Sequence, residues 1–479
     1  MQVIIFLFIT LSIAAFTYIK CRNAPRKDND KQEYFLAGGS LPWFYVAGSI
    51  MLTNISTEQI VGMNGAQMLL VAWWEIAAAA GLIILARWII PIYFKYKCTT
   101  TVEILEHKFK SKTLRATVST LFLIGYVFIL LPTVLYTGSL FLKSMFNLDY
   151  SIISIAIVIS IIGSLYAIYG GLRAIAVSDS FNGIGLLVMG LVVTILSLNA
   201  IDFDFSGIPA DRMTLIGSNQ SPIPWHTLLT GMIFIQIFYW GTNMVITQRA
   251  LGAKSIKEAQ KGIYAAAILK VLIPFIVVMP GIISFKLYGP IGDVSYGRLV
   301  GDLLPNYLSG AFAAVMLGAI LSTFNSTLNS SAALYYCDIH EVFINHRANI
   351  KKVSTIFSVI IALIALCLVP VFQSAESIIA MLQQMSGLYS MPVLSAFLMA
   401  LCWRNIDARA VIIGLIAGTL LYAVFTFVWS PLHYIHLMFI TMCFCMLTSI
   451  VCSRVIYNSN VELILTKSSN KPAIDAIPK

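Results

Sequence analysis

The chain has 479 residues, of which 59% are hydrophobic and only 11% are charged, and its mean hydropathy is +0.86. Soluble globular proteins carry about a quarter charged residues. This composition therefore excludes a soluble protein and indicates an integral membrane protein. The net charge of +10 comes from basic loops between apolar stretches, so it gives no reason to expect a nucleic-acid partner.

About thirteen apolar stretches are long enough to cross a bilayer, whose hydrocarbon core of roughly 30 Å takes about 20 helical residues. They lie at 2–20, 43–69, 70–94, 116–142, 151–169, 175–199, 226–248, 262–285, 308–337, 353–371, 377–402, 408–428 and 434–453. The gaps between them leave no room for a domain outside the membrane. We expect a single transmembrane domain over 1–479, in which 2–20 is a retained additional helix rather than a signal peptide.

The distribution of Lys and Arg predicts the orientation, because loops kept in the cytoplasm carry the excess of basic residues. Basic loops alternate along the chain with acidic ones such as 201–213 and 372–377. The basic loops are 20–31, 87–115, 248–261, 345–352, 402–410 and the segment after Arg454. We expect a multi-pass protein of the cell membrane with its N-terminus outside and its C-terminus in the cytoplasm.

The sequence contains none of the common enzyme motifs, such as a phosphate-binding glycine loop, a zinc-protease motif or a nucleophile elbow. The eight cysteines have no disulfide or metal-ligand spacing. We therefore expect no enzyme and look for a path or a binding pocket at membrane depth.

Polar side chains at membrane depth are costly, about 2.5 to 3.5 kcal/mol for a charge at a helix centre, so each is a functional candidate. Five places stand out. In chain order they are "NISTEQ" at 54–59, Glu75, "QIFYWGTN" at 236–243, Lys270 and "MLQQMSG" at 381–387.

Two of these places share a pattern. "NISTEQ" opens one block of five stretches, 43–199, and "QIFYWGTN" opens the next, 226–402, and each interrupts an apolar segment near its middle. Discontinuous helices in corresponding positions of two halves are typical of transporters built from inverted repeats, which bind ion and substrate at the breaks. The sequence therefore predicts an all-α fold of two five-helix repeats with broken first helices, followed by two further helices over 408–453.

Adjacent hydroxyls in a long apolar stretch suggest an ion site. Ser322 and Thr323 lie about one turn after the carbonyl of Ala319, and small hard cations prefer several oxygen ligands. Ser and Thr also pack between membrane helices without any ligand, and that alternative stays open on this motif alone.

Four long motifs resemble the sodium:solute symporter family, in particular its sodium/glucose and sodium/galactose branch. They are "EYFLAGGSLPWFYVAGSIMLTNISTEQIVGMNG", "YAIYGGLRAIAVSD", "FYWGTNMVITQRALGAKSIKEAQKG" with the following "AAILKVLIPFIVVMPGI", and "AILSTFNSTLNSS". The likeness runs in one order from about residue 30 to 405. It implies the LeuT-like inverted-repeat fold and alternating-access symport of a neutral monosaccharide with Na⁺ as the coupling ion.

The resemblance also implies roles for individual residues. The sodium ligands would be the carbonyls of Leu52, Ile55 and Ala319 with the hydroxyls of Ser322 and Thr323. The substrate-binding residues would be Asn54, Gln59, Glu75, Gln236, Tyr239, Lys270 and Gln383, with Tyr239 stacking on the sugar. Asp179 matches an acidic position near the family's ion exit route.

Each assignment has a plainer alternative. Lys270 could extend to the cytoplasmic surface, Glu75 could bond a neighbouring helix, and Asp179 could cap a helix end; Glu58 has no assigned role. The chain departs from the sugar transporters at Gln236 and Ala78, where they carry Asn and Ser. Inositol or sialic acid as the substrate, and a non-coupled sensor or channel, are the alternative functions.

Overall fold

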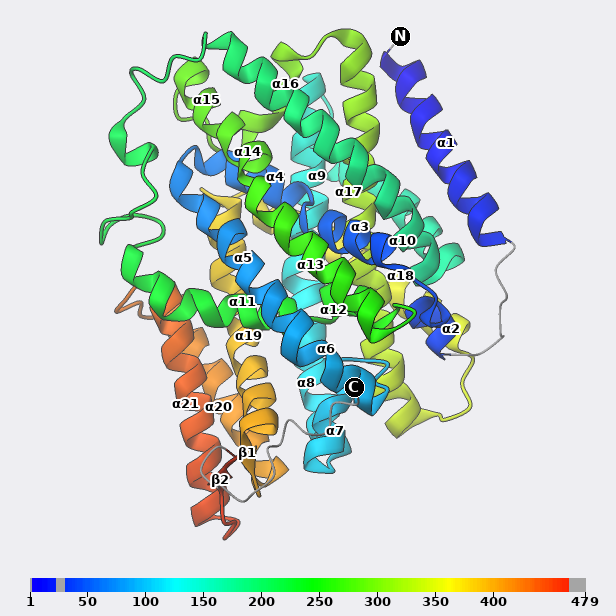
Figure 1. The fold of residues 1–479 in the computed structure, drawn as a ribbon, viewed down its shortest axis with the longest axis vertical. Coiled ribbons are helices and arrows are strands. Elements are labelled where there is room, and N and C mark those ends of the chain that lie inside the picture. The colour runs from blue at the N-terminus through cyan, green and yellow to red at the C-terminus, as the bar shows by residue number, and fades with distance from the viewer. Residues whose placement is uncertain (1, 23–30, 465–479) are drawn as a thin grey trace.

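The computed structural model describes residues 2–22 and 31–464, together with the side chains of these residues except 21, 22 and 165–171. This part of the chain is almost entirely helical (Figure 1). Its two strands, β1 (Trp403–Arg404) and β2 (Glu462–Leu463), form an antiparallel pair with Trp403 opposite Leu463. The basic loop predicted at 20–31 lies mostly outside the described residues.

The first half of the chain forms ten α-helices. They are α1 (Gln2–Arg22), α2 (Lys31–Leu36), α3 (Trp43–Asn54), α4 (Thr57–Ala66), α5 (Trp73–Ile84), α6 (Ile90–Tyr96), α7 (Glu103–Phe109), α8 (Lys112–Gly125), α9 (Leu131–Phe146) and α10 (Ile152–Ala200). Short 3₁₀ or π segments join some of them, namely η1 (Ala37–Gly39), η2 (Leu69–Ala72), η3 (Leu85–Ile89) and η4 (Tyr126–Leu130).

The second half begins with a loop that carries η5 (Ala210–Arg212) and η6 (Trp225–Leu229). Its helices are α11 (Gly231–Gly241), α12 (Met244–Leu251), α13 (Ile256–Leu272), α14 (Pro274–Val277), α15 (Met279–Tyr288), α16 (Ser295–Leu303), α17 (Asn306–Ala333), α18 (Ile350–Phe372), α19 (Ile378–Cys402), α20 (Ala408–Phe427) and α21 (Tyr434–Val455). The 3₁₀ segment η7 (Gly292–Val294) precedes α16, and the π-helix η8 (Leu334–Ile344) continues α17.

The described residues form fewer uninterrupted membrane-spanning helices than the thirteen apolar stretches predict. By length and composition, nine of the described helical segments can cross a membrane, or ten if the bent pair Ile256–Leu272 and Pro274–Tyr288 counts as one span. The stretches 43–69 and 226–248 are each broken into two helices, and 262–285 is bent. The stretches 151–169 and 175–199, expected as separate spans, both lie within α10.

The first predicted break is present and narrow. α3 ends at Asn54, Ile55 leaves the helical region with φ −81° and ψ 71°, and Ser56 is extended. Helix α4 then restarts at Thr57, and the N–H groups of Gln59 and Ile60 donate to the carbonyl of Ser56. Only two residues of "NISTEQ" are therefore unwound, and the other four lie on the helix ends beside the break.

The second predicted break lies just after Gly241. α11 ends there, Thr242 is non-helical, and Asn243 caps α12 by accepting a hydrogen bond from the N–H of Val245 at 3.1 Å. An Asn at this position is among the preferred helix N-caps because its side chain satisfies a free N–H group. A third interruption, which we did not expect, bends α13 against α14 and α15 by 46°.

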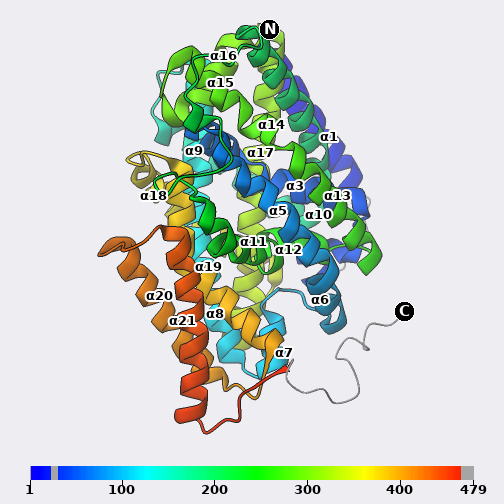
Figure 2. The same ribbon diagram turned by 60° about the vertical axis from the view of Figure 1, so that its left-hand side comes forward.

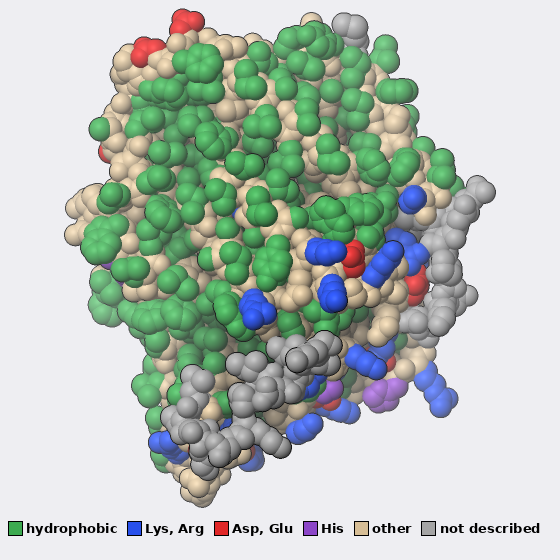
Figure 3. All heavy atoms as spheres, viewed as in Figure 1, with side chains coloured by type: hydrophobic (Ala, Val, Ile, Leu, Met, Phe, Trp, Pro, Cys, Tyr) green, Lys and Arg blue, Asp and Glu red, His purple; other side chains and the backbone are tan. Residues whose placement is uncertain are grey.

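The broken helices lie inside the bundle, with α5 and α13 on one side and α9 and α17 on the other (Figures 1 and 2). α3 packs against α10, α13 and α17, whereas α11 packs against α5 and α19. At the edges of the molecule, α1 contacts α10 and α17, and α20 and α21 contact α19. The face of the molecule shown in Figure 3 is largely apolar over its upper and middle parts, as expected of helices that face lipid.

Candidate functional site

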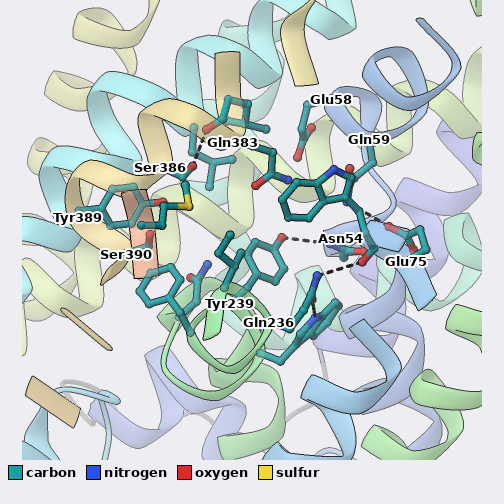
Figure 4. Close-up of a pocket in the computed structure, with 18 residues that line it drawn as sticks. Asn54, Glu58, Gln59, Glu75, Gln236, Tyr239, Gln383, Ser386, Tyr389 and Ser390 are labelled. Carbon is teal, nitrogen blue, oxygen red and sulfur yellow. Dashed lines mark hydrogen bonds between the residues drawn. The ribbon is translucent and has the colours of Figure 1, made fainter. Parts of the chain in front are cut away.

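A cavity lies between the two helix breaks (Figure 4). The space open to the centres of water molecules is about 70 Å³, room for roughly five waters at 10–15 Å³ each. α3, α4 and α5 contribute Asn54, Glu58, Gln59, Trp74 and Glu75; α11 and the following break contribute Ile235, Gln236, Phe238, Tyr239, Trp240 and Asn243; α19 contributes Leu382, Gln383, Ser386, Tyr389 and Ser390; Leu130 and Met438 complete the wall.

A hydrogen-bonded network joins five of the predicted residues beside this cavity. The Lys270 ammonium donates to Asn54 Oδ1 and to Glu75 Oε2. Asn54 Nδ2 donates to the Tyr239 hydroxyl at 3.2 Å, and Gln59 Nε2 donates to Glu75 Oε1 at 3.1 Å. The four helices α3, α4, α5 and α13 are thereby linked around one buried ion pair, with Tyr239 joining from α11.

Lys270 does not line the cavity itself but bonds Asn54 and Glu75, which do. Its side chain is fully buried and forms an ion pair with Glu75, which is 1% exposed. Its ammonium also lies 5.3 Å from the centre of the Trp240 ring, a distance at which a cation is attracted to an aromatic face. The alternative in which Lys270 extends to the cytoplasmic surface is therefore wrong, whereas Glu75 does bond neighbouring helices in addition to lining the cavity.

The two other predicted amides differ in their surroundings. Gln236 is engaged within the protein, since its amide donates to the carbonyl of Trp74 at 3.2 Å and accepts from Trp240 Nε1 at 2.9 Å. Gln383 projects toward the cavity from α19 (Figure 4). No hydrogen bond to the Gln383 side chain occurs within residues 2–22 and 31–464.

Several cavity residues were not predicted. Ser386, Tyr389 and Ser390 follow Gln383 by three, six and seven positions, which places all four on one face of a helix. That spacing could have identified them once Gln383 was chosen. Met438, by contrast, comes from α21, and no feature of the sequence links that helix to the cavity.

The segments that carry the predicted sodium ligands meet at a second place, between the break after α3 and the middle of α17. The Thr323 hydroxyl donates to the carbonyl of Thr53 at 3.2 Å, so the two elements are in direct contact. All of the proposed ligands are buried, namely Leu52, Ile55, Ala319, Ser322 and Thr323.

The oxygens at this place fit a sodium ion. Among the described residues, no backbone N–H donates to the carbonyls of Leu52, in the last turn of α3, and Ile55, just after its end, because the helix stops at Asn54. The Ser322 hydroxyl is buried without a hydrogen-bond partner in the same part of the chain. Neutral carbonyl and hydroxyl oxygens suit a small hard cation, and this break leaves the carbonyls of Leu52 and Ile55 free, whereas the carbonyl of Ala319 lies within the unbroken helix α17.

Asp179 lies next to this second place and away from the cavity. It is in the middle of α10, fully buried, and its Oδ2 accepts a hydrogen bond from Ser49 of α3 at 2.6 Å. Its other oxygen has no partner that meets hydrogen-bond geometry, although Ser322 is close enough to interact with the carboxyl group. The alternative in which Asp179 caps a helix end is wrong, since no helix ends there.

One glycine holds the cavity helices close together. Gly81 of α5 lies directly against α11, where an added Cβ would come within 2.6 Å of the Trp240 ring and 2.8 Å of the carbonyl oxygen of Gln236. The second of these atoms belongs to the backbone and cannot rotate away. The separation between α5 and α11 therefore depends on the missing side chain at position 81.

The fold is shared with solved transporters. It superposes with a TM-score of 0.78 on a Na⁺-coupled sialic acid symporter in a substrate-bound outward-open state, at 17% identity and with 94% of this chain and 97% of that chain covered. The nucleobase-cation symporter Mhp1 gives a TM-score of 0.59 at 17% identity, with 91% and 96% covered. These likenesses confirm the expected LeuT-like inverted-repeat fold.

Sequence relatives are transporters of the expected kind. The chain is 35% identical over 469 residues to the uncharacterized symporter YidK of Escherichia coli (strain K12), covering 92% of this chain and 82% of that protein. It is 31% identical over 427 residues to the sodium/glucose cotransporter of Vibrio parahaemolyticus, with 81% and 78% covered. The sodium/myo-inositol cotransporter 2 of Oryctolagus cuniculus is 28% identical over 468 residues, with 88% and 68% covered.

A protein-family model covers most of the chain. It matches residues 34–418, from α2 into α20, and it describes the sodium:solute symporter family. Together with the relatives above, this match shows that the chain is a multi-pass membrane transporter and not an enzyme. The chain belongs to the sodium:solute symporter family.

Proposed function

We propose that this sodium-coupled symporter carries a neutral monosaccharide of the glucose or galactose kind. The observation that carries the proposal is the make-up of the cavity wall, which combines carboxylate and amide groups with the rings of Tyr239 and Tyr389. Sugar hydroxyls both donate and accept hydrogen bonds, so amides and carboxylates together suit them. Aromatic rings suit the apolar face of a pyranose.

The charges around the cavity favour a neutral substrate over an acidic one. Glu58 and Glu75 both line it, and Lys270, which balances Glu75, is already bonded to it. No Lys or Arg is among the described residues that line the cavity, so a carboxylate-bearing substrate would meet repulsion there. Inositol, a neutral polyol, fits the same wall and is the alternative that the sodium/myo-inositol relative supports.

For the ion, we propose a site formed by the carbonyls of Leu52, Ile55 and Ala319 with the hydroxyls of Ser322 and Thr323. Because this site joins the break after α3 to α17, ion binding would hold the two elements together and shape the cavity beside Asn54 for the sugar. Tyr239 would then move to release the sugar into the cytoplasm. Asp179 would lie along the path by which the sodium ion leaves. In this scheme the repeats 43–199 and 226–402 rock against each other.

The driving force is sufficient for accumulation. One sodium ion entering down 100 mV yields about 2.3 kcal/mol, and a tenfold sodium gradient adds about 1.4 kcal/mol. With one ion per sugar, these terms support roughly a few-hundred-fold concentration of a neutral solute.

We propose that the N-terminus lies outside and the C-terminus in the cytoplasm. The distribution of charge supports this orientation, because most Lys and Arg side chains in Figure 3 gather over the lower half of the face, with a few acidic side chains among them, whereas the upper edge shows Asp and Glu without Lys or Arg. Basic surface near helix ends marks the cytoplasmic side.

The test is uptake of labelled monosaccharides and inositol into proteoliposomes under an inward sodium gradient, with potassium substituted as the control. We expect saturable, sodium-dependent accumulation of one neutral sugar. Uptake that is equal in potassium would reject sodium coupling to it, and accumulation of an acidic solute alone would reject the neutral substrate.

The ion ligands are tested in the same assay with Ser322→Ala and Thr323→Ala together. Both hydroxyls are lost, together with the methyl group of Thr323, so we expect the sodium concentration for half-maximal uptake to rise at least about tenfold. Ser374→Ala, at an exposed hydroxyl in the loop after α18, is the matched control. An unchanged sodium dependence would reject these ligands.

A further inference from the structure

Glu58 is a buried carboxylate at the cavity to which no role has been given. It lies in the first turn of α4, is 4% exposed and forms part of the cavity wall. Its Oε2 is buried without a hydrogen-bond partner, as is the neighbouring Gln59 Oε1. The Ser56 hydroxyl lies beside the carboxyl group, yet it leaves this oxygen unsatisfied.

The donors around the cavity are largely used within the protein. These donors are Lys270 Nζ on Asn54 and Glu75, Asn54 Nδ2 on Tyr239, Gln59 Nε2 on Glu75, Gln236 Nε2 on Trp74 and Trp240 Nε1 on Gln236. The unsatisfied buried oxygens of Glu58 and Gln59 can only accept, if Glu58 is ionised. At this end the cavity therefore suits a ligand that donates hydrogen bonds.

Leaving a buried carboxylate oxygen unsatisfied is costly, since a charged group loses its water without gaining a protein partner. The position of Glu58 near the N-terminus of α4 offsets part of this cost through the helix dipole, but it provides no donor to Oε2. Two nearby protein donors, the Ser56 hydroxyl and the Gln383 amide, do not bond Oε2 in this arrangement, so this oxygen is free to accept a hydrogen bond from what the cavity holds.

Resting on the sugar substrate proposed above, we propose that Glu58 is a substrate ligand that accepts a hydrogen bond from one sugar hydroxyl. Figure 4 shows the Glu58 and Gln383 side chains together on one side of the cavity, apart from the Asn54 and Glu75 group. A sugar is then held from both sides, and Glu58 selects substrates that present a donor at that position and repels those that present an anion.

The experiment compares sugars in which one hydroxyl at a time is replaced by fluorine, which can accept but not donate. In the wild type, one fluorinated sugar is expected to show a KM about 10- to 100-fold higher than the parent sugar, the usual effect of losing a hydrogen bond to a charged group. In Glu58→Gln the amide can donate to fluorine, so the penalty at that position should shrink to within a few-fold while the other positions keep theirs.

The matched control is Glu376→Gln, the same change at an exposed glutamate in the loop before α19, which should keep the wild-type profile. Thermal unfolding of both variants checks that Glu58→Gln leaves the fold intact. Wild-type sugar uptake with an identical fluorine profile in Glu58→Gln overturns the ligand role and leaves the symport proposal standing. Failure of the wild type to take up any sugar overturns the proposed substrate class, and this inference with it.

Discussion

Lys270 and Glu75 are tolerated at membrane depth because each neutralises the charge of the other. Each would be expensive alone in a low-dielectric interior, and together they form a buried ion pair whose remaining bonding capacity goes to Asn54 and Gln59. Such pairs contribute little net stability relative to apolar residues, but removing one partner leaves an uncompensated buried charge. The pair therefore makes the cavity wall sensitive to single substitutions and tolerant of matched ones.

We predict that Lys270→Met lowers the free energy of unfolding by about 3–5 kcal/mol, because Glu75 is left buried without its cation. Lys270→Met combined with Glu75→Gln should recover most of that loss, since no lone charge remains. Thermal or denaturant unfolding in detergent measures both. Equal destabilisation by the single and double variants would show that the pair is not coupled.

At the scale of residues, the sequence singles out Glu75 and Lys270 as unusual, but it does not predict which side chains they contact. Glu75 and Lys270 are recognisable because an ionisable residue in an apolar stretch has no other reason to be there. That Lys270 bonds Asn54 and Glu75 and takes no place on the cavity wall depends on how α3, α5 and α13 pack, over sequence separations of up to 216 residues. Periodicity and composition do not encode that packing.

At the scale of elements, the break between α11 and α12 depends on Asn243. Its Oδ1 accepts from the Tyr126 hydroxyl at 2.6 Å as well as from the N–H of Val245. The same side chain therefore starts α12 and ties it to η4. A broken helix at membrane depth has to satisfy its freed backbone groups within the protein, and this residue does so at the second break.

Asn243→Ala should lower the free energy of unfolding by about 2–4 kcal/mol, combining a lost cap of about 1 kcal/mol with an unsatisfied tyrosine hydroxyl of about 1–3 kcal/mol. Asn243→Ser keeps a capping oxygen and should lose less. Tyr126→Phe in the Asn243→Ala background should restore part of the stability by removing the stranded hydroxyl. If the three variants unfold alike, the side chain has no role in the break.

Pro274 is the sequence feature that accounts for the bend between α13 and α14. Pro274 follows Lys270 by four residues, and a proline inside a helix removes one backbone hydrogen bond and clashes with the carbonyl four residues earlier. The apolar run over 262–285 continues through the proline, so hydropathy alone predicts a single span there. The two breaks that we did predict carry polar residues or a glycine within the run, which interrupt hydropathy as well as backbone geometry.

At the scale of the whole molecule, a charge cluster ties the two halves of the chain together at one end. Arg115 of α8 donates to Asp338 of η8 at 2.7 Å, to Glu103 at 2.7 Å and to Glu106 at 2.8 Å. Asp338 is fully buried and also accepts from Ser119 at 2.5 Å. Arg115 thus serves three carboxylates, of which the innermost has no contact with water.

Arg115→Met should therefore reduce the free energy of unfolding by about 3–5 kcal/mol, because Asp338 keeps its charge without a cation. The control is Arg298→Met, whose ion pair with Asp302 is 3.8 Å long and half-exposed and should contribute less than about 1 kcal/mol. Unfolding midpoints of purified protein compare the two. Similar shifts for both variants would contradict a structural role for the buried cluster.

The close approach of α5 and α11 at Gly81 separates two properties of the transporter, namely which chemical groups of the solute it contacts and how large a solute it admits. Gly81 does not line the cavity, yet it sets how near Glu75 lies to Tyr239 and Trp240. The side chains that line the cavity determine which atoms contact the solute. The spacing between the helices that carry them, here α5 and α11, determines how large a solute can enter. A substitution at this one position should therefore alter the size of the solute that the cavity accepts while leaving the lining side chains untouched, so related transporters can diverge in substrate size without replacing a single contact residue.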